Sequence, residues 1–374
     1  MDKDISKIDK NFVVETNIKK DNIKFYDVRR DPFDIYGLYD ARNLPKFTRM
    51  PDEVAKTVGS AEKSENVRTL AFDTAGGRVR FSTDSSYIAI HVERETLRHM
   101  PHMTLTGSSG FDLYMDDPGG GSTFCGSYQP STSKPNYESI KEFNFKEKKT
   151  RYFTINFPLY NTVTNLYIGL EDTANVGHGK KYKIEKPVVY YGSSITQGGC
   201  VGRPGLAYEH IITRKLDCDH INLGFSGSGK GEDEMVDYLA SIDMSVFVAD
   251  YDHNSPNAEH LERTVRNMYS KMRAAHPELP MIFISRPDFD KPLDCEGTCI
   301  ASLARRDAIY RMFYEAFRAG DKKVYFIDGE YLFGNEMRDC CTVDLTHPND
   351  LGHARIAEAI GYRLGKIFEG SIIF

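Results

Sequence analysis

The sequence predicts two domains of different fold class: an antiparallel β-sandwich, jelly-roll-like in its strand pattern, followed by an α/β domain with a parallel sheet. Apolar and polar residues alternate with period two between about residues 20 and 185. After Pro187, short apolar runs instead alternate with segments of helix length. The chain has 374 residues, which is long enough for two hydrophobic cores. We therefore place the domains at residues 1–185 and 186–374.

The strands of the first domain show one apolar face each. In "GRVRFSTDSSYIAIHVE", Val79 and Phe81 alternate with Arg78 and Arg80, and "RYFTINFPLY" repeats this alternation over residues 152–157. Gly, Ser and Asp separate these short runs. This pattern is typical of an antiparallel sandwich, in which every second side chain enters the core.

The second domain alternates apolar runs with candidate helices. The runs predict strands at residues 188–192, 220–225, 245–251, 281–286 and 324–328. The remaining segments predict helices near residues 205–216, 232–242, 258–275, 300–319 and 350–366. In the fourth helix, the expected apolar face consists of Leu303, Ala304, Ala308, Met312, Phe313, Ala316 and Phe317. Five strands that alternate with helices imply a parallel sheet with helices on both faces.

The composition is that of a globular protein and limits the possible partners. Hydrophobic residues make up 40% of the chain and charged residues 27%, with a formal net charge of −6. This charge does not favour a nucleic-acid partner, and no apolar run reaches the roughly 18 residues that would predict a membrane span. The N-terminal "MDKDISKIDKNF" is charged and lacks the apolar region of a secretory signal. We therefore expect a cytoplasmic protein without a membrane partner.

The seven cysteines do not indicate a disulfide framework, because their number is odd and their spacing irregular. A zinc site with Cys295, Cys299 and the adjacent Cys340 and Cys341 as ligands is the alternative. No C-x-x-C pair supports that arrangement. We expect reduced, mostly buried thiols and no metal site.

Two short segments carry a possible catalytic pattern. "GSSITQGG" directly follows the first predicted parallel strand, and active sites of such sheets lie at the carboxyl ends of the strands. "DLTHPND" follows the last strand and contains Asp344 and His347, three residues apart. At that spacing the carboxylate can bind the imidazole Nδ1–H, which leaves Nε2 free to accept a proton from a serine. Asp-x-x-His alone is a weak signal, but its combination with the serine turn is stronger.

Together with "NLGFSGSGKGE", these segments resemble the SGNH (GDSL-type) hydrolase family over residues 187–366. Residues 192–196 match the block that carries the family's nucleophile, and the matching position is Ser194 rather than Ser193. Asp344 and His347 match the block that carries the acid and the base. The resemblance implies a three-layer α/β/α, flavodoxin-like fold and a Ser194–His347–Asp344 triad that needs no cofactor and no metal.

The same resemblance implies an oxyanion hole. Its expected donors are the backbone N–H groups of Ser194 and Gly227 and one side chain from "DYDHN". We favour Asn254 for this side chain, although strict register from the strand points to His253. The sequence departs from the family pattern here, because the family block reads Gly-x-Asn-Asp.

The first domain carries a second resemblance. "GFDLY", residues 110–114, is similar to the Gly-x-Asp-Leu-Tyr domain that precedes some bacterial SGNH hydrolases. Candidate substrate-binding residues are Asp112 in this motif, His99 and His102 in the preceding loop, and Arg203 in "GRPGLAY". The alternative for the histidines is an ordinary loop position, and for Arg203 an ion pair or a helix cap.

We therefore expect a serine carboxylic ester hydrolase that acts on small acyl esters, above all acetyl esters, with an O-acetylated carbohydrate or another small molecule as substrate. A thioesterase or lysophospholipase is the alternative enzyme, although the chain lacks the long apolar cap of a lipase. The alternative outside enzymes is a carbohydrate-binding protein with a relic hydrolase domain. The intact Ser194, His347 and Asp344 argue against it. The oligomeric state stays open, and a homo-oligomer is compatible with the sequence.

Overall fold

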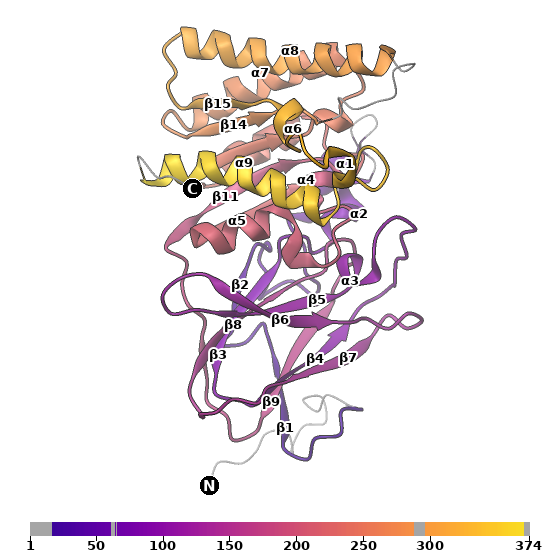
Figure 1. Cartoon of the computed structure of the whole chain (residues 1–374), viewed down its shortest axis with the longest axis vertical. Helices are drawn as coiled ribbons and strands as arrows, with labels where there is room; N and C mark the ends of the chain where they lie inside the picture. Colours follow the sequence, from indigo (N-terminus) through magenta and orange to yellow (C-terminus); the bar gives the residue numbers. More distant parts are fainter. Residues whose placement is uncertain (1–16, 61–63, 65, 288–295, 370–374) are drawn as a thin grey trace.

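The computed structural model describes residues 17–60, 64, 66–287 and 296–369. A β-sandwich and a parallel α/β domain lie one above the other along the long axis of the molecule (Figure 1). The chain therefore has the fold class that the sequence predicts. Among the described residues, none of the helices combines the length and hydropathy that a membrane crossing requires.

The sandwich consists of two antiparallel sheets. One has the order β1-β9-β4-β7, formed by Ile23–Asp27, Asn165–Glu171, Tyr87–Glu93 and Tyr137–Glu142. The other has the order β10-β3-β8-β5-β6, with β2 beside β3, formed by Val176–His178, Arg78–Thr83, Arg151–Asn156, Phe111–Asp116, Ser122–Tyr128 and Asp34–Tyr36. The inward side chains of both sheets, Val79 and Phe81 among them, form one buried apolar cluster, which stabilises the sandwich.

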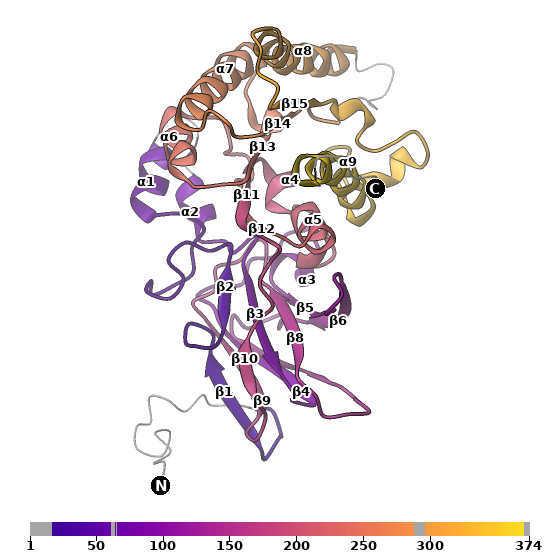
Figure 2. The same cartoon turned by 90° about the vertical axis from the view of Figure 1, so that its left-hand side faces the viewer.

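The second domain contains a parallel sheet with the order β12-β11-β13-β14-β15. Its strands are Cys218–Gly224, Ile184–Gly192, Val246–Asp250, Met281–Ile284 and Val324–Ile327. Helices α5 (Tyr208–Leu216) and α9 (Asp350–Glu369) cover one face, and α6 (Asp233–Ser241), α7 (Ala258–Ala275) and α8 (Glu296–Arg318) cover the other (Figure 2). Numbered within this domain, the strand order is 2-1-3-4-5. Its crossover point lies between β11 and β13, where ligands of such sheets bind.

Two helices of the first half pack on the second domain, which the period-two pattern did not predict. Helix α1 spans Asp52–Ser60 and helix α2 spans Val67–Ala71. Ala55, Val58 and Leu70 belong to the same buried cluster as the inner side chains of β11 and α6. The sheet is therefore covered by segments from both halves of the chain.

The predicted apolar face of α8 is only partly correct. Ala308, Met312 and Ala316 are buried, as expected, but Leu303 is 36% exposed and Phe317 42%. Ile309 is buried in place of these two residues. The helix is therefore rotated relative to the predicted stripe, because its neighbours α7 and β15 determine which face is covered.

The polar side of β3 faces the second domain instead of solvent. Arg78 is 1% exposed and forms an ion pair with Asp219 on β12. Its Nε donates to the Tyr182 hydroxyl at 3.0 Å, and its Nη2 donates to the His220 carbonyl at 3.1 Å. This arginine therefore links the sandwich to the edge strand of the parallel sheet.

Arg78→Ala is expected to lower the free energy of unfolding by about 3–5 kcal/mol in urea denaturation, because it leaves the Asp219 carboxylate buried without its partner. The matched control is Arg266→Ala, which removes a partly exposed arginine from its ion pairs with Glu262 and Glu315. The control should change stability by about 1 kcal/mol or less. Equal effects of the two substitutions would contradict a special role for the Arg78 contact.

Candidate active site

The turn after β11 distinguishes its two serines. Ser193 caps the short helix α4, Ser194–Gln197: its buried hydroxyl accepts a hydrogen bond from the Ile195 N–H at 3.2 Å. Gly192 allows the close approach of this helix, since a Cβ there would lie 2.0 Å from Thr196 Oγ1. Capping engages the hydroxyl of Ser193, whereas that of Ser194 points toward the loop before α9. Only Ser194 is thus in position to meet a base.

Ser194, His347 and Asp344 form one hydrogen-bonded chain. Ser194 Oγ lies 2.9 Å from His347 Nε2, and His347 Nδ1 lies 2.8 Å from Asp344 Oδ2. Because an ionised carboxylate only accepts hydrogen bonds, Nδ1 carries the proton and Nε2 accepts one from the serine. The structure therefore brings together the three residues that the sequence singled out.

Asp344 is held in its ionised form. Burial acts to raise the pKa of this carboxyl, but the backbone and side-chain bonds from His347 and the bond from the Thr346 N–H outweigh burial and lower the pKa to about 2. A negative charge therefore faces Nδ1 at any pH at which the protein would work. A carboxylate in this position would stabilise an imidazolium formed by proton transfer to Nε2.

Both domains hold the turn that carries Ser194 in place. The Ser194 carbonyl accepts bonds from the Tyr160 hydroxyl of the sandwich, at 3.0 Å, and from the Gly199 N–H, at 2.8 Å. His353 of α9 donates from Nε2 to the Gly199 carbonyl at 3.1 Å, and burial lowers the pKa of this histidine to about 4. Sequence reasoning missed Tyr160 and His353, because neither lies in a recognisable motif.

The expected oxyanion donors lie on two loops that meet beside the turn. Gly192 pairs in register with Gly224 of β12 and with Asp250 of β13, so the loops that follow these strands start side by side. Gly227 has a φ of +69°, and a Cβ there would meet no atom within 4 Å. The space beside the Gly227 Cα is therefore open, and a ligand can approach the backbone of this loop.

Of the two candidate side chains on the loop after β13, Asn254 contacts the Gly227 loop. Its Nδ2 donates to the Phe225 carbonyl at 2.9 Å, which uses one of its two protons. His253 instead interacts with the buried carboxyl of Asp250, whose pKa burial raises to about 7 against the opposing influence of the histidine. These contacts favour Asn254 as the third donor.

Two family matches together cover most of the chain. Residues 185–364 match the GDSL-like lipase/acylhydrolase family, and residues 23–176 match the GxDLY N-terminus of SGNH-hydrolase-type esterases. The chain belongs to the SGNH (GDSL-type) hydrolases. It is thus an ester hydrolase by family, with the accessory domain that the "GFDLY" motif predicts.

Solved structures of similar proteins share both domains of this SGNH hydrolase. A protein from Bacteroides ovatus described as a GDSL-like lipase is 26% identical, with a TM-score of 0.82 over 93% of this chain and 98% of its own. A salicylyl-acyltransferase from a tetracycline biosynthetic pathway is 17% identical, with a TM-score of 0.73 over 94% and 99% of the two chains. An acetyl xylan esterase from Butyrivibrio proteoclasticus is 13% identical, with a TM-score of 0.56 over 92% and 98%. No curated protein matches the chain significantly.

Two of the predicted substrate-binding residues of the SGNH hydrolase bind each other. Arg203 Nη1 donates to Asp112 Oδ2 at 2.8 Å and to the Tyr114 hydroxyl at 2.6 Å. Asp112 is fully buried and also accepts from the Gly205 N–H at 2.8 Å. The pair therefore joins the Gly-x-Asp-Leu-Tyr motif to the second domain. This contact is the ion pair expected as the alternative role of Arg203.

The two predicted loop histidines differ in their surroundings. His99 is exposed, whereas the ring of His102 lies beside that of His347, with 5.5 Å between the ring centroids. Among the four predicted substrate-binding residues, His102 is the one that touches the Ser194–His347–Asp344 chain. The first domain therefore contributes a side chain to the edge of the site.

The zinc arrangement weighed from the sequence cannot be placed. Cys295 and the side chain of Cys299 lie outside the described residues. Cys125, Cys200, Cys218, Cys340 and Cys341 are free thiols. Cys200 follows the turn that carries Ser194, and burial and the nearby Asp344 raise the pKa of its thiol to about 12. This thiol is therefore uncharged in the free protein.

Proposed function

We propose that this SGNH hydrolase is a serine esterase that removes small acyl groups, above all acetyl groups, from carbohydrate. The observation that carries the proposal is the continuous hydrogen-bonded chain from Ser194 Oγ through His347 to Asp344. A serine hydroxyl needs such a base, and the base needs such an orienting carboxylate, for nucleophilic attack on an ester.

The reaction would proceed in two halves. Ser194 Oγ attacks the ester carbonyl carbon while His347 Nε2 takes the hydroxyl proton, and the oxyanion is bound by the N–H groups of Ser194 and Gly227 and the amide of Asn254. His347 then protonates the leaving alcohol, which leaves an acyl-serine. A water molecule, activated by the same nitrogen, hydrolyses the acyl-serine to release the acid and restore the proton to Ser194.

The sugar part of the proposal rests on two further observations. The first domain reaches the site through His102, and a second domain beside Ser194 and His347 can contact a substrate larger than its acyl group. An acetyl xylan esterase is also among the proteins that share this two-domain fold.

A substrate series tests the acyl and sugar preferences separately. We expect kcat/KM to fall from p-nitrophenyl acetate to butyrate to octanoate, and acetate to be released from acetylated xylo-oligosaccharides. A preference for octanoate would favour the lysophospholipase or thioesterase alternative. Turnover of none of these esters by the purified chain would favour the non-catalytic alternative.

Asn254→Ala is expected to lower kcat by about 10²-fold with little change in KM, because an oxyanion donor binds its partner fully only in the transition state. His253→Ala is the neighbouring control and should retain most of the activity. If His253→Ala instead carried the loss of kcat and Asn254→Ala did not, strict strand register would be correct and our preferred donor wrong.

A further inference from the structure

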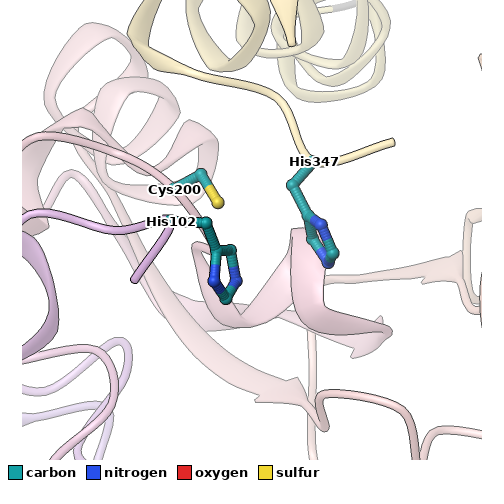
Figure 3. A group of neighbouring side chains, drawn as sticks. All are labelled: His102, Cys200 and His347. Carbon is teal, nitrogen blue, oxygen red and sulfur yellow. The ribbon is translucent and has the colours of Figure 1, made fainter. Parts of the chain in front are cut away.

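Three potential metal ligands lie close together at His347, the general base of the proposed triad. One ligand atom each of His102, Cys200 and His347 lies within 4.8 Å of the other two. Figure 3 shows the three side chains facing one space, with the Cys200 sulfur directed toward the two rings. They come from the first domain, the nucleophile turn and the loop before α9. Nothing in their sequence spacing would suggest a shared site.

The loop that carries His102 is fixed against the segment that carries Cys200. Thr104 Oγ1 and Thr106 Oγ1 both donate to the Gly202 carbonyl, at 2.9 and 2.7 Å. The two segments also approach so closely at Gly107 that a Cβ there would lie 2.1 Å from the Val201 carbonyl oxygen. The Cys200 backbone is held at a φ of +71°. The backbone segments that carry His102 and Cys200 are therefore held against each other.

His347 is oriented as a metal-ligating histidine usually is. Its Nδ1–H donates to Asp344, so only Nε2 is left to bind a cation, and a carboxylate behind the ring strengthens the ligand. Cysteine sulfur with two imidazole nitrogens is a ligand set for Zn²⁺ and similar ions, with a fourth position left for solvent.

We propose that His102, Cys200 and His347 form a regulatory site for a thiophilic divalent cation such as Zn²⁺, which inhibits the hydrolase by occupying His347 Nε2. The inhibition rests on the proposed function, because it requires His347 to be the catalytic base. The existence of the site does not.

The free protein needs only a small adjustment to bind the cation. Zinc bonds of about 2.0 Å to nitrogen and 2.3 Å to sulfur place ligand atoms about 3.5 Å apart, so the side chains must close by roughly 1 Å. His102 is exposed and can rotate. Binding must also displace the Cys200 proton, which lowers the apparent affinity of the site for the cation.

Cobalt binding tests the site without any turnover. We expect Co²⁺ added to the full-length Ser194→Ala variant to produce thiolate-to-metal charge-transfer absorption with one equivalent bound. The further substitution Cys200→Ala in this variant should abolish the absorption. The control substitution Cys340→Ala, which removes an exposed thiol, should leave the absorption unchanged. Absorption that survives Cys200→Ala, or that never develops, would overturn the proposal. His102→Gln on the exposed loop gives a second test, with at least about tenfold weaker Co²⁺ binding expected.

Zinc titration during hydrolysis of p-nitrophenyl acetate tests the inhibition. We expect inhibition that a chelator reverses, with at least about tenfold more Zn²⁺ needed in Cys200→Ala, each variant being compared with its own zinc-free rate. Cobalt binding with unimpaired or increased turnover in the presence of Zn²⁺ would overturn the inhibitory role. If no variant hydrolyses esters, the proposed function fails, and the cobalt result still decides whether the site exists.

Discussion

Ser194→Ala is expected to lower kcat/KM for p-nitrophenyl acetate by at least about 10⁴-fold, because it removes the nucleophile from a unit that acts together. The remaining activity would come from the oxyanion donors and from substrate binding. The melting temperature should change little, since the hydroxyl makes its bond to His347 at the edge of the site and the serine backbone keeps its bonds from Tyr160 and Gly199.

Ser193→Ala is the matched control for this prediction, with the same atom removed one residue earlier. It loses the cap of α4, which typically costs about 1 kcal/mol of stability, but keeps the Ser194–His347 contact. We expect most of the activity to remain. Loss of activity in Ser193→Ala with retention in Ser194→Ala would mean that the nucleophile had been assigned to the wrong serine.

His347→Ala should impair hydrolysis about as strongly as Ser194→Ala, because without Nε2 the serine keeps its proton. The two losses should not add: the double variant is expected to be no slower than either single variant, as for other residues that act as one unit. A double-mutant cycle on kcat/KM measures this directly. Additive losses would show that the two residues contribute separately.

Labelling by a covalent serine probe provides a second measurement on the same variants. The probe should react with the wild-type Ser194 and far more slowly in His347→Ala. Asp344→Asn, which keeps the size of the side chain but not its charge, should reduce turnover by about 10⁴-fold through the loss of ring orientation. Labelling of His347→Ala at the wild-type rate would contradict its role as the base.

The regular elements of the second domain could be predicted because their signals are local. The range predicted for α7, 258–275, is also the observed one, and its start coincides with Asn257, whose side chain caps the helix by accepting from the His260 N–H. The helix α1 was missed because only Ala55 and Val58 are buried in its nine residues, too few to form an apolar stripe. Its partner α6 lies far along the chain, where no local pattern points to it.

In the candidate site too, contacts within one segment could be predicted and contacts between distant segments could not. Asp344 and His347 lie on one loop, so a spacing of three residues was enough to predict their contact. The distinction between Ser193 and Ser194 came from the family resemblance, and the structure supplies its physical reason in the capping bond. The meeting of His102, Cys200 and His347 had no local signal, since the three residues come from separate segments.

By itself, the sequence determined the two fold classes, the succession of strands and helices along the second domain, and the loop that pairs Asp344 with His347. These features depend on periodicity and on short spacings within one segment. Only the tertiary structure decided what covers each surface. Arg78 and Arg80 are nearly fully buried although their alternation with Val79 and Phe81 predicts a polar outer face. A period of two separates the faces of a strand, but only contacts with distant segments, such as that of Arg78 with Asp219, decide whether the second face meets water or another domain.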